Sequence, residues 1–222
     1  MSALLITGTG IRVGKTRVGC ALARALAATG RRVVAIKPVE TGCADATAAE
    51  EDGARLAAAT GQAAPREALF RFAAPLVPAL AAEREDAAID LDALVLRIEE
   101  LRGDADVLLM EGAGGLLSPI AWEWSVVELA RTLGAAVLVV GVDGLGVINH
   151  ALLTLSALEL AGLPVAGLVL TAPEIADAST GTNAAAIARV SGLDRVLALT
   201  DLSDDGAAEL APVLGWMDQP AE

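Results

Sequence analysis

The chain has 222 residues, of which 55% are hydrophobic and 20% charged, and its formal net charge is −13. This length suits one α/β domain that buries most of its apolar surface on folding. The acidity excludes a partner held mainly through a phosphate backbone, so we expect no nucleic acid. The apolar residues occur in short runs, which excludes a membrane-spanning helix, and we expect no membrane partner.

The two cysteines, Cys20 and Cys43, form neither a metal-ligand spacing nor a disulfide framework. The N-terminus enters a strand-like run at once, without the basic start and cleavage site of a signal peptide. Both features favour a reducing compartment, and we expect a cytoplasmic protein. Because no linker or internal repeat divides the chain, residues 1–222 are predicted to form one domain.

Apolar runs of strand length alternate with helical patterns along the chain. The predicted strands are Ala3–Gly8, Val33–Pro38, Val107–Glu111, Ala136–Val142, Val165–Leu170 and Val196–Leu199. The predicted helices are Lys15–Ala28, a short one near Asp52–Ala59, Leu91–Leu101, Val126–Leu133, Val147–Ala161 and Asn183–Val190. The remainder of the proline-broken stretch Gly42–Glu85 is expected to be loops. This alternation predicts a three-layer α/β fold with a mostly parallel central sheet flanked by helices.

Ligands of open α/β sheets bind beyond the carboxyl ends of the strands. The first of these ends is followed by GTGIRVGKT, residues 8–16. Its glycines let backbone N–H groups turn towards an anion, and the next helix offers the positive end of its dipole. Lys15 is expected to reach the outer phosphates and Thr16 to ligate Mg²⁺. The segment therefore predicts a P-loop NTPase-like domain; a glycine-rich turn that binds nothing is the alternative.

The predicted contacts with the nucleotide phosphates come from the loop and the first helical residues: Gly8, Arg12, Val13, Gly14, Lys15, Thr16 and Arg17. Glu111 ends the apolar run DVLLME, where P-loop proteins place an acidic residue for the magnesium shell. A carboxylate after four apolar residues is costly to bury unpaired, and a nearby cation removes that cost.

Four further segments accompany a phosphate loop that is one residue longer than G-x-x-x-x-G-K-[ST]. They are IKPVETG (36–42), EDGARL (51–56), MEGAGG (110–115) and GVINHALLT (146–154). Together with the lengthened loop, these segments resemble the dethiobiotin synthetase family, and the resemblance extends from residue 1 to about residue 170. It implies an ATP-dependent cyclo-ligase of biotin biosynthesis, with ATP as co-substrate and Mg²⁺ as cofactor.

The reaction implied by the resemblance begins with a carbamate formed from CO₂ and one amine of 7,8-diaminononanoate. ATP phosphorylates the carbamate, and the second amine closes a cyclic urea, which gives dethiobiotin, ADP and phosphate. In such a family Lys37 holds the carbamate, and Lys15 and Thr41 complete the catalytic set. Thr16, Asp52 and Glu111 are the implied metal ligands, although the acidic run around Asp52 is also typical of a solvated helix N-terminus.

The resemblance also implies a homodimer. The helix that begins at Val147, Ile148 and Asn149 receives the carboxylate of the diamine across the subunit interface, as expected for a helix N-terminus. Gly114 lies where the family's backbone approaches the substrate, so the predicted substrate contacts are Lys37, Thr41, Gly114, Val147, Ile148 and Asn149.

Three positions depart from the family pattern. Ile11 and Arg12 replace polar residues of the lengthened loop, and Arg12 adds charge near the phosphates. Thr171 stands where members selective for adenine have an asparagine, which predicts relaxed base selectivity. Three other interpretations stay open: an amidating synthetase of corrinoid assembly, a partition or site-selection ATPase, and an inactive nucleotide-binding module.

Overall fold

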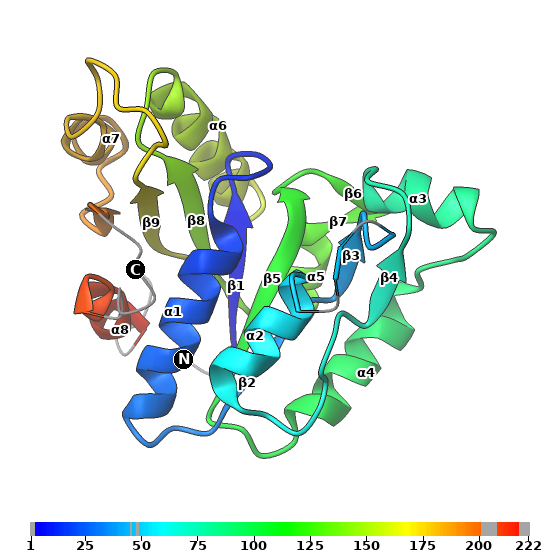
Figure 1. Cartoon of the computed structure of the whole chain (residues 1–222). Helices are drawn as coiled ribbons and strands as arrows, with labels where there is room; N and C mark the ends of the chain where they lie inside the picture. Colours follow the sequence, from blue (N-terminus) through cyan, green and yellow to red (C-terminus); the bar gives the residue numbers. More distant parts are fainter. Residues whose placement is uncertain (1–2, 45, 48, 201–207, 218–222) are drawn as a thin grey trace.

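The computed structural model describes residues 3–44, 46–47, 49–200 and 208–217. Its centre is a six-stranded sheet in which every pairing is parallel (Figure 1). In spatial order the strands are β10 (Val196–Ala198), β9 (Val165–Thr171), β8 (Ala136–Val142), β1 (Ala3–Gly8), β5 (Val107–Gly115) and β2 (Val33–Ile36). The predicted parallel α/β sheet is thereby confirmed.

Helices cover both faces of this sheet, which gives the three predicted layers (Figure 1). One face carries α1 (Lys15–Ala28), α2 (Asp52–Thr60) and α8 (Ala211–Met217). The other carries α3 (Pro78–Arg84), α4 (Leu91–Arg102), α5 (Val126–Thr132), α6 (Val147–Leu160) and α7 (Asn183–Ser191). Alternate side chains of a strand point to opposite faces. In β1, Leu4 and Ile6 accordingly pack beneath α1, while Leu5 packs on the opposite side.

The expectation of only one short helix between Gly42 and Glu85 was wrong, because this stretch also contains β4 (Phe70–Phe72) and α3. Strand β4 pairs with β3 (Val39–Thr41), which follows β2 after the interruption at Pro38. Proline has no N–H to donate to a sheet, so β2 ends before it. Strands of three residues and a helix of seven are too short for hydrophobic periodicity to reveal.

Strand β5 continues to Gly115, four residues beyond its predicted end. Ile6 pairs with Glu111 and Gly8 pairs with Gly115, so β5 advances four residues while β1 advances two. The glycines of the EGAGG segment allow this irregularity, which brings the end of β5 beside the start of the phosphate loop. The hairpin of β6 (Pro119–Ala121) and β7 (Trp124–Ser125) then leads into α5.

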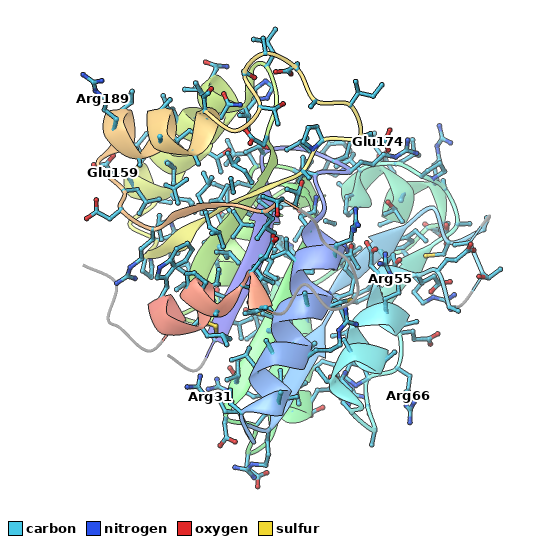
Figure 2. The ribbon with its side chains drawn as sticks, turned by 60° about the vertical axis from the view of Figure 1, so that its left-hand side comes forward. Arg31, Arg55, Arg66, Glu159, Glu174 and Arg189 are labelled. Atoms are coloured by element: carbon cyan, nitrogen blue, oxygen red, sulfur yellow. The ribbon has the colours of Figure 1, made fainter. Side chains whose placement is uncertain are left out.

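In Figure 2 the side chains of Arg31, Arg66 and Arg189 project from separate corners of the molecule. Helix α8 lies against α1 in both views (Figures 1 and 2). Within the described ranges, no helix is both long enough and apolar enough to cross a bilayer.

Candidate active site

The phosphate loop folds around the Lys15 side chain. Lys15 Nζ donates to the carbonyl oxygen of Gly10 at 2.9 Å, and a Cβ atom at Gly8 would lie 3.1 Å from the same nitrogen. Helix α1 begins after Gly14, whose φ of +90° suits glycine, and no side chain in the described part of the chain caps its N-terminus. The first amides of α1 are therefore available to an anion.

Lys15 shares its surroundings with a second lysine. Burial and the neighbouring Lys37 ammonium lower the pKa of Lys15 to about 8, while Glu111 and Asp52 act in the opposite direction. Two ammonium groups that repel each other across one site stabilise a polyanion placed between them. The sequence prediction that both lysines serve one site is consistent with this coupling.

The other loop residues have different surroundings. Ile11 and Arg12 are exposed, and Arg12 has a φ of +54°, which is uncommon for a residue with a side chain. Val13 is buried, and Arg17 is exposed on the first turn of α1. Direct contact of Arg12, Val13 and Arg17 with phosphate stays a prediction.

Thr171, at the end of β9, lies beneath the loop. Its hydroxyl is 3.0 Å from the carbonyl oxygen of Val13 and 3.2 Å from that of Gly141. A Cβ atom at Gly14 would lie 2.8 Å from Thr171 Cγ2, so glycine is needed at position 14 for space as well as for its φ. Thr171 thus supports the phosphate loop, and relaxed base selectivity stays a prediction.

Four residues from separate segments meet beside the loop, and we call them the reaction cluster: Thr16, Lys37, Asp52 and Glu111. The Thr16 hydroxyl lies 2.7 Å from Asp52 Oδ1 and 2.9 Å from Glu111 Oε1. Lys37 Nζ donates to Asp52 Oδ2 at 2.9 Å and to Glu111 Oε1 at 2.7 Å. The three predicted metal ligands and the predicted carbamate-binding lysine therefore lie together.

Burial makes these charges dependent on one another. The side chains of Lys37 and Glu111 are only 5% and 1% exposed. Burial lowers the pKa of Lys37, but Glu111 and Asp52 outweigh it and raise that pKa above its ordinary value. Burial raises the pKa of Glu111 despite the opposing Lys37 ammonium. For Asp52, Lys37 and the Thr16 hydroxyl overcome burial and lower the pKa. Lys37 thus remains a cation.

The donor set of the reaction cluster fits a divalent cation that prefers oxygen ligands. Glu111 Oε2 is buried and has no hydrogen-bond partner, although Lys37 pairs with the other oxygen, and an unpartnered buried carboxylate oxygen is costly. Asp52 and the Thr16 hydroxyl supply further oxygens, and Mg²⁺ takes such ligands together with phosphate oxygens and water. Within the described residues, no group of three or more His, Cys, Asp or Glu side chains gathers as a metal site, so the third protein oxygen is the threonine hydroxyl.

The position of Asp52 depends on Glu40, a residue that the sequence analysis missed. The Glu40 carboxylate accepts hydrogen bonds from the backbone N–H groups of Asp52 and Gly53, the second at 3.0 Å. It thereby caps the N-terminus of α2, where Glu51 provides no side-chain cap. A Cβ atom at Gly53 would lie 2.3 Å from the backbone nitrogen of Ala68, so the glycine lets α2 approach that segment.

A second missed contact fixes the residue before Asp52. The Glu51 side chain is 2% exposed and pairs with the Arg71 guanidinium of β4, whose Nε donates to Glu51 Oε2 at 2.8 Å. A bidentate pair of this kind restricts orientation as well as position. The only signal in the sequence that could have indicated these supports is the EDG segment. Its first residue, Glu51, occupies the N-cap position of α2 and is not a usual capping residue.

Thr41 and Gly114 take no part in the hydrogen bonds of the reaction cluster. Thr41 is partly buried on β3. Gly114 has a φ of +73°, and a Cβ atom there would lie 2.5 Å from Ser118 Oγ, so position 114 requires glycine. The contact of either residue with a substrate stays a prediction.

Helix α6 begins far from the reaction cluster in sequence but at the same edge of the sheet. Its N-terminal cap is Gly146, with a φ of +93° and no side-chain hydrogen bond to the helix. The Val147 N–H donates to the carbonyl of Gly144, so this amide is already used. Ile148 is partly buried and Asn149 is exposed, and their amides have no backbone acceptor in the described part of the chain.

The same edge of the sheet contains a cavity of about 430 Å³. It lies between the phosphate loop, the turn after β5 and the side of α6, and residues from all three line it: Gly8, Thr9, Gly10, Ile11, Gly115, Leu116, Leu117, Ser118, Leu153, Thr154 and Ala157. A lining with several aliphatic side chains beside a glycine-rich anion loop suits a ligand with a hydrocarbon body and a charged or polar end.

Comparison with known proteins agrees with this geometry. A family profile described as an AAA domain matches residues 2–207. The chain is 44% identical over 194 residues to an ATP-dependent dethiobiotin synthetase of Anaeromyxobacter dehalogenans (strain 2CP-C), and the match covers 86% of each chain. It is 45% identical over 166 residues to the enzyme of the same name from Nitrosospira multiformis, covering 74% of this chain and 73% of the relative.

The fold itself has more distant neighbours. The septum site-determining protein MinD of Pyrococcus horikoshii, solved in complex with Mg-ADP, superposes with a TM-score of 0.58 at 18% sequence identity. The match covers 99% of this chain and 90% of that protein. At this identity the likeness extends to the fold alone.

Proposed function

The chain belongs to the family of ATP-dependent dethiobiotin synthetases, and we propose that it closes a cyclic urea on 7,8-diaminononanoate. The reaction consumes CO₂ and ATP and releases dethiobiotin, ADP and phosphate. The observation that carries the proposal is the reaction cluster, in which Lys37 Nζ lies within 2.9 Å of two carboxylates beside the phosphate loop. The septum site-determining protein of Pyrococcus horikoshii shares only the fold at 18% identity, whereas the synthetases of Anaeromyxobacter dehalogenans (strain 2CP-C) and Nitrosospira multiformis are 44% and 45% identical.

The proposed steps conserve every atom. One amine of the substrate attacks CO₂ and loses a proton, which gives a carbamate. A carbamate oxygen attacks the γ-phosphorus of ATP, and ADP departs. The second amine then attacks the carbamate carbon and releases a proton to solvent, and phosphate leaves with the oxygen that had joined carbon to phosphorus. Each step needs reactants held in place and negative charge neutralised, more than it needs an acid or a base.

Lys37 is the group that neutralises the carbamate. Its ammonium stays charged because Asp52 and Glu111 raise its pKa, and it is a compact donor with three N–H bonds. Lys15 serves the outer phosphates. Its side chain lies inside the phosphate loop, next to the first amides of α1. Thr41, on the strand that follows Lys37, completes the proposed carbamate contacts.

Thr16, Asp52 and Glu111 are the residues that would hold Mg²⁺. When bound there, the ion supplies positive charge to the phosphate oxygens. The unpartnered Oε2 of Glu111 supports this assignment, because a carboxylate oxygen buried without a partner gains most from a nearby cation.

The rest of the substrate has a matching environment. The aliphatic lining of the 430 Å³ cavity, which includes Ile11, Leu117 and Leu153, suits the hydrocarbon chain of the diamine acid. Its carboxylate is assigned to the start of α6 of a second subunit, where the amides of Ile148 and Asn149 are available and that of Val147 already donates to Gly144.

We further propose a homodimer formed through the outer face of α6. Leu153 and Leu160 on this helix are 62% and 90% exposed, and Leu145 before it is 89% exposed. Large apolar side chains gathered on one face mark an interaction surface. A cytoplasmic location completes the proposal, since ATP and biosynthetic intermediates are available there.

The direct test is incubation of the purified protein with 7,8-diaminononanoate, bicarbonate, MgCl₂ and ATP, followed by mass spectrometry of the products. We expect one cyclic urea for each ADP, and none when the diamine is omitted. ADP release without a cyclic urea would contradict the proposal, as would turnover by a Lys37→Ala variant at the wild-type rate.

A further inference from the structure

Two loops at the carboxyl edge of the sheet hold each other through a pair of aspartates. Asp143 belongs to the turn that joins β8 to α6, and its side chain is buried. Its Oδ1 accepts a hydrogen bond from Asn183 Nδ2 at 2.7 Å, and its Oδ2 accepts one from the backbone N–H of Gly181 at 2.8 Å. The turn before α6 is thus attached to the start of α7.

Asp177 makes the reciprocal connection. It lies in the loop after β9, and its Oδ2 accepts a hydrogen bond from the backbone N–H of Leu145 at 2.8 Å. Its Oδ1 accepts from the backbone N–H and the hydroxyl of Ser179 at 2.7 and 2.6 Å. Hydrogen bonds from Ser179 and Leu145 lower the pKa of Asp177 to about 2, so the carboxylate is ionised at neutral pH.

These contacts, which we call the aspartate clamp, meet at the turn that leads into α6. A Cβ atom at Gly144 would lie 3.2 Å from Asp177 Oδ2, so glycine lets the carboxylate approach the backbone. The next residues, Leu145 and Gly146, direct the chain into the helix. Because Gly146 lies at a φ of +93° and no side chain caps α6, the amides at its start depend on the clamp for their orientation.

We propose that Asp177 and Asp143 are positioning residues that determine specificity for the carboxylate end of the substrate. The clamp fixes the first amides of α6, and these amides act in the active site of the partner subunit. This inference rests on the proposed function, which assigns the substrate carboxylate to the same amides. The hydrogen bonds of the two carboxylates join the turn before α6 to the start of α7 and the segment before it and reach neither the reaction cluster nor the phosphate loop, so we expect their removal to act on recognition of the diamine acid.

Steady-state kinetics separates this role from a general structural one. Asp177→Ala is expected to raise KM for 7,8-diaminononanoate about tenfold, which is the usual loss for one charge-assisted hydrogen bond. KM for ATP is expected to stay within about twofold of wild type. Asp177→Asn keeps one acceptor oxygen, so its KM for 7,8-diaminononanoate is expected to lie between those of wild type and Asp177→Ala. Asp90→Ala is the matched control, because Asp90 caps α4 through the N–H of Ala93 at 2.8 Å, away from this edge.

A substrate analogue tests the specificity directly. The wild-type enzyme is expected to prefer the diamine acid over the corresponding diamine without a carboxylate, and Asp177→Ala is expected to lose about tenfold of that preference. An unchanged preference in a variant with an unchanged melting temperature overturns the inference. Absence of cyclic urea formation by the wild-type enzyme overturns the proposed function and, with it, the inference.

Mixed dimers show which subunit the clamp serves. A dimer of one Lys37→Ala and one Asp177→Ala subunit can be purified by two different tags. Its only intact reaction cluster belongs to the Asp177→Ala subunit, and this cluster faces the start of α6 of the Lys37→Ala subunit, where the clamp is intact. We expect about half the wild-type kcat and a wild-type KM. A KM that remains tenfold raised contradicts the assignment of the clamp to the partner's site.

Hydrogen exchange gives a readout that does not depend on turnover. In Asp177→Ala the amide of Leu145 loses its acceptor, so it and the amides of Ile148 and Asn149 are expected to exchange faster than in wild type, while those of β8 do not change. Unchanged exchange of the Leu145 amide in the variant would overturn the clamp.

Discussion

In the proposed reaction, the reaction cluster and the start of α6 hold an anion in two different ways. In the cluster, the side chains of Lys37 and Glu111 are buried and ionic contacts fix them within one chain. At the start of α6, Asn149 is exposed, backbone amides replace charged side chains, and the support comes from the aspartate clamp behind the turn. Under the proposed function, the buried region serves charge that changes during the reaction, and the exposed region serves a carboxylate that does not react.

Removing the Lys37 ammonium is the strongest way to break the buried region. Lys37→Ala is expected to lower kcat about 100- to 1,000-fold, the usual effect of one electrostatic contact to a transition state, while ATP affinity is kept. Without Mg²⁺ the variant also leaves two carboxylates facing each other, and the free energy of unfolding should fall by about 3–5 kcal/mol. Single-turnover kinetics, ATP titration and thermal melting with and without MgCl₂ measure these effects. Equal losses of kcat and ATP affinity would contradict the separation of roles.

Lys15→Ala provides the contrast, since it is the only other lysine in the chain. Its ammonium faces the loop rather than the two carboxylates, so its loss is expected to weaken ATP binding about 10- to 100-fold and to lower turnover as well. Isothermal titration with a non-hydrolysable ATP analogue measures the affinity. A variant that binds the analogue as tightly as wild type would remove Lys15 from the phosphate site.

Glu40→Gln sharpens the comparison, because it changes the support of the cluster and leaves its members intact. The amide keeps one acceptor for the amides of Asp52 and Gly53 and loses the other, which should lower the free energy of unfolding by about 1–2 kcal/mol and kcat about tenfold. Asp90→Asn, at the cap of α4, should cost similar stability and leave kcat unchanged. If both variants lower kcat alike, the Glu40 effect is not one of positioning.

The smallest expected effect is the titration of Asp177. A depressed carboxyl pKa contributes stability that is present above the reference value of 3.8 and is lost as the pH falls through about 2. In Ser179→Ala the largest cause of the depression disappears, so the midpoint should rise towards 3.8. Carboxyl chemical shifts followed by NMR give both midpoints. A midpoint already near 3.8 in wild type would contradict the clamp geometry.

The fold was largely predictable because each buried strand of the parallel sheet has a continuous apolar run. For the same reason the apolar part of β5 could be located, although the strand runs on to Gly115, past its predicted end at Glu111, and GTGIRVGKT placed Lys15 and Thr16 at the start of α1. The short elements β3, β4 and α3 carry too little hydrophobic periodicity for such an argument, and none of the three was predicted.

The supports of the site were not predictable, because they join residues far apart in the chain. Glu40 caps α2 from strand β3. Asp177 holds the turn at Leu145, which lies 32 positions before it in the chain. Each is an ordinary polar residue in the sequence, and only the arrangement of the sheet edge brings it to its partner. Thr171 was interpreted through the base it could select, whereas its hydroxyl contacts the phosphate loop and β8.

The central claim is that the reaction cluster stabilises a carbamate while it is phosphorylated. The transfer of oxygen from CO₂ to phosphate tests this claim most directly. The enzyme is mixed with ATP, diaminononanoate and ¹⁸O-labelled CO₂ and quenched before the label exchanges with water, and the phosphate is analysed by mass spectrometry. Attack of a carbamate oxygen on ATP predicts one ¹⁸O atom in each phosphate released. Phosphate that carries oxygen from the solvent instead would mean that water attacks ATP, and the account would be contradicted.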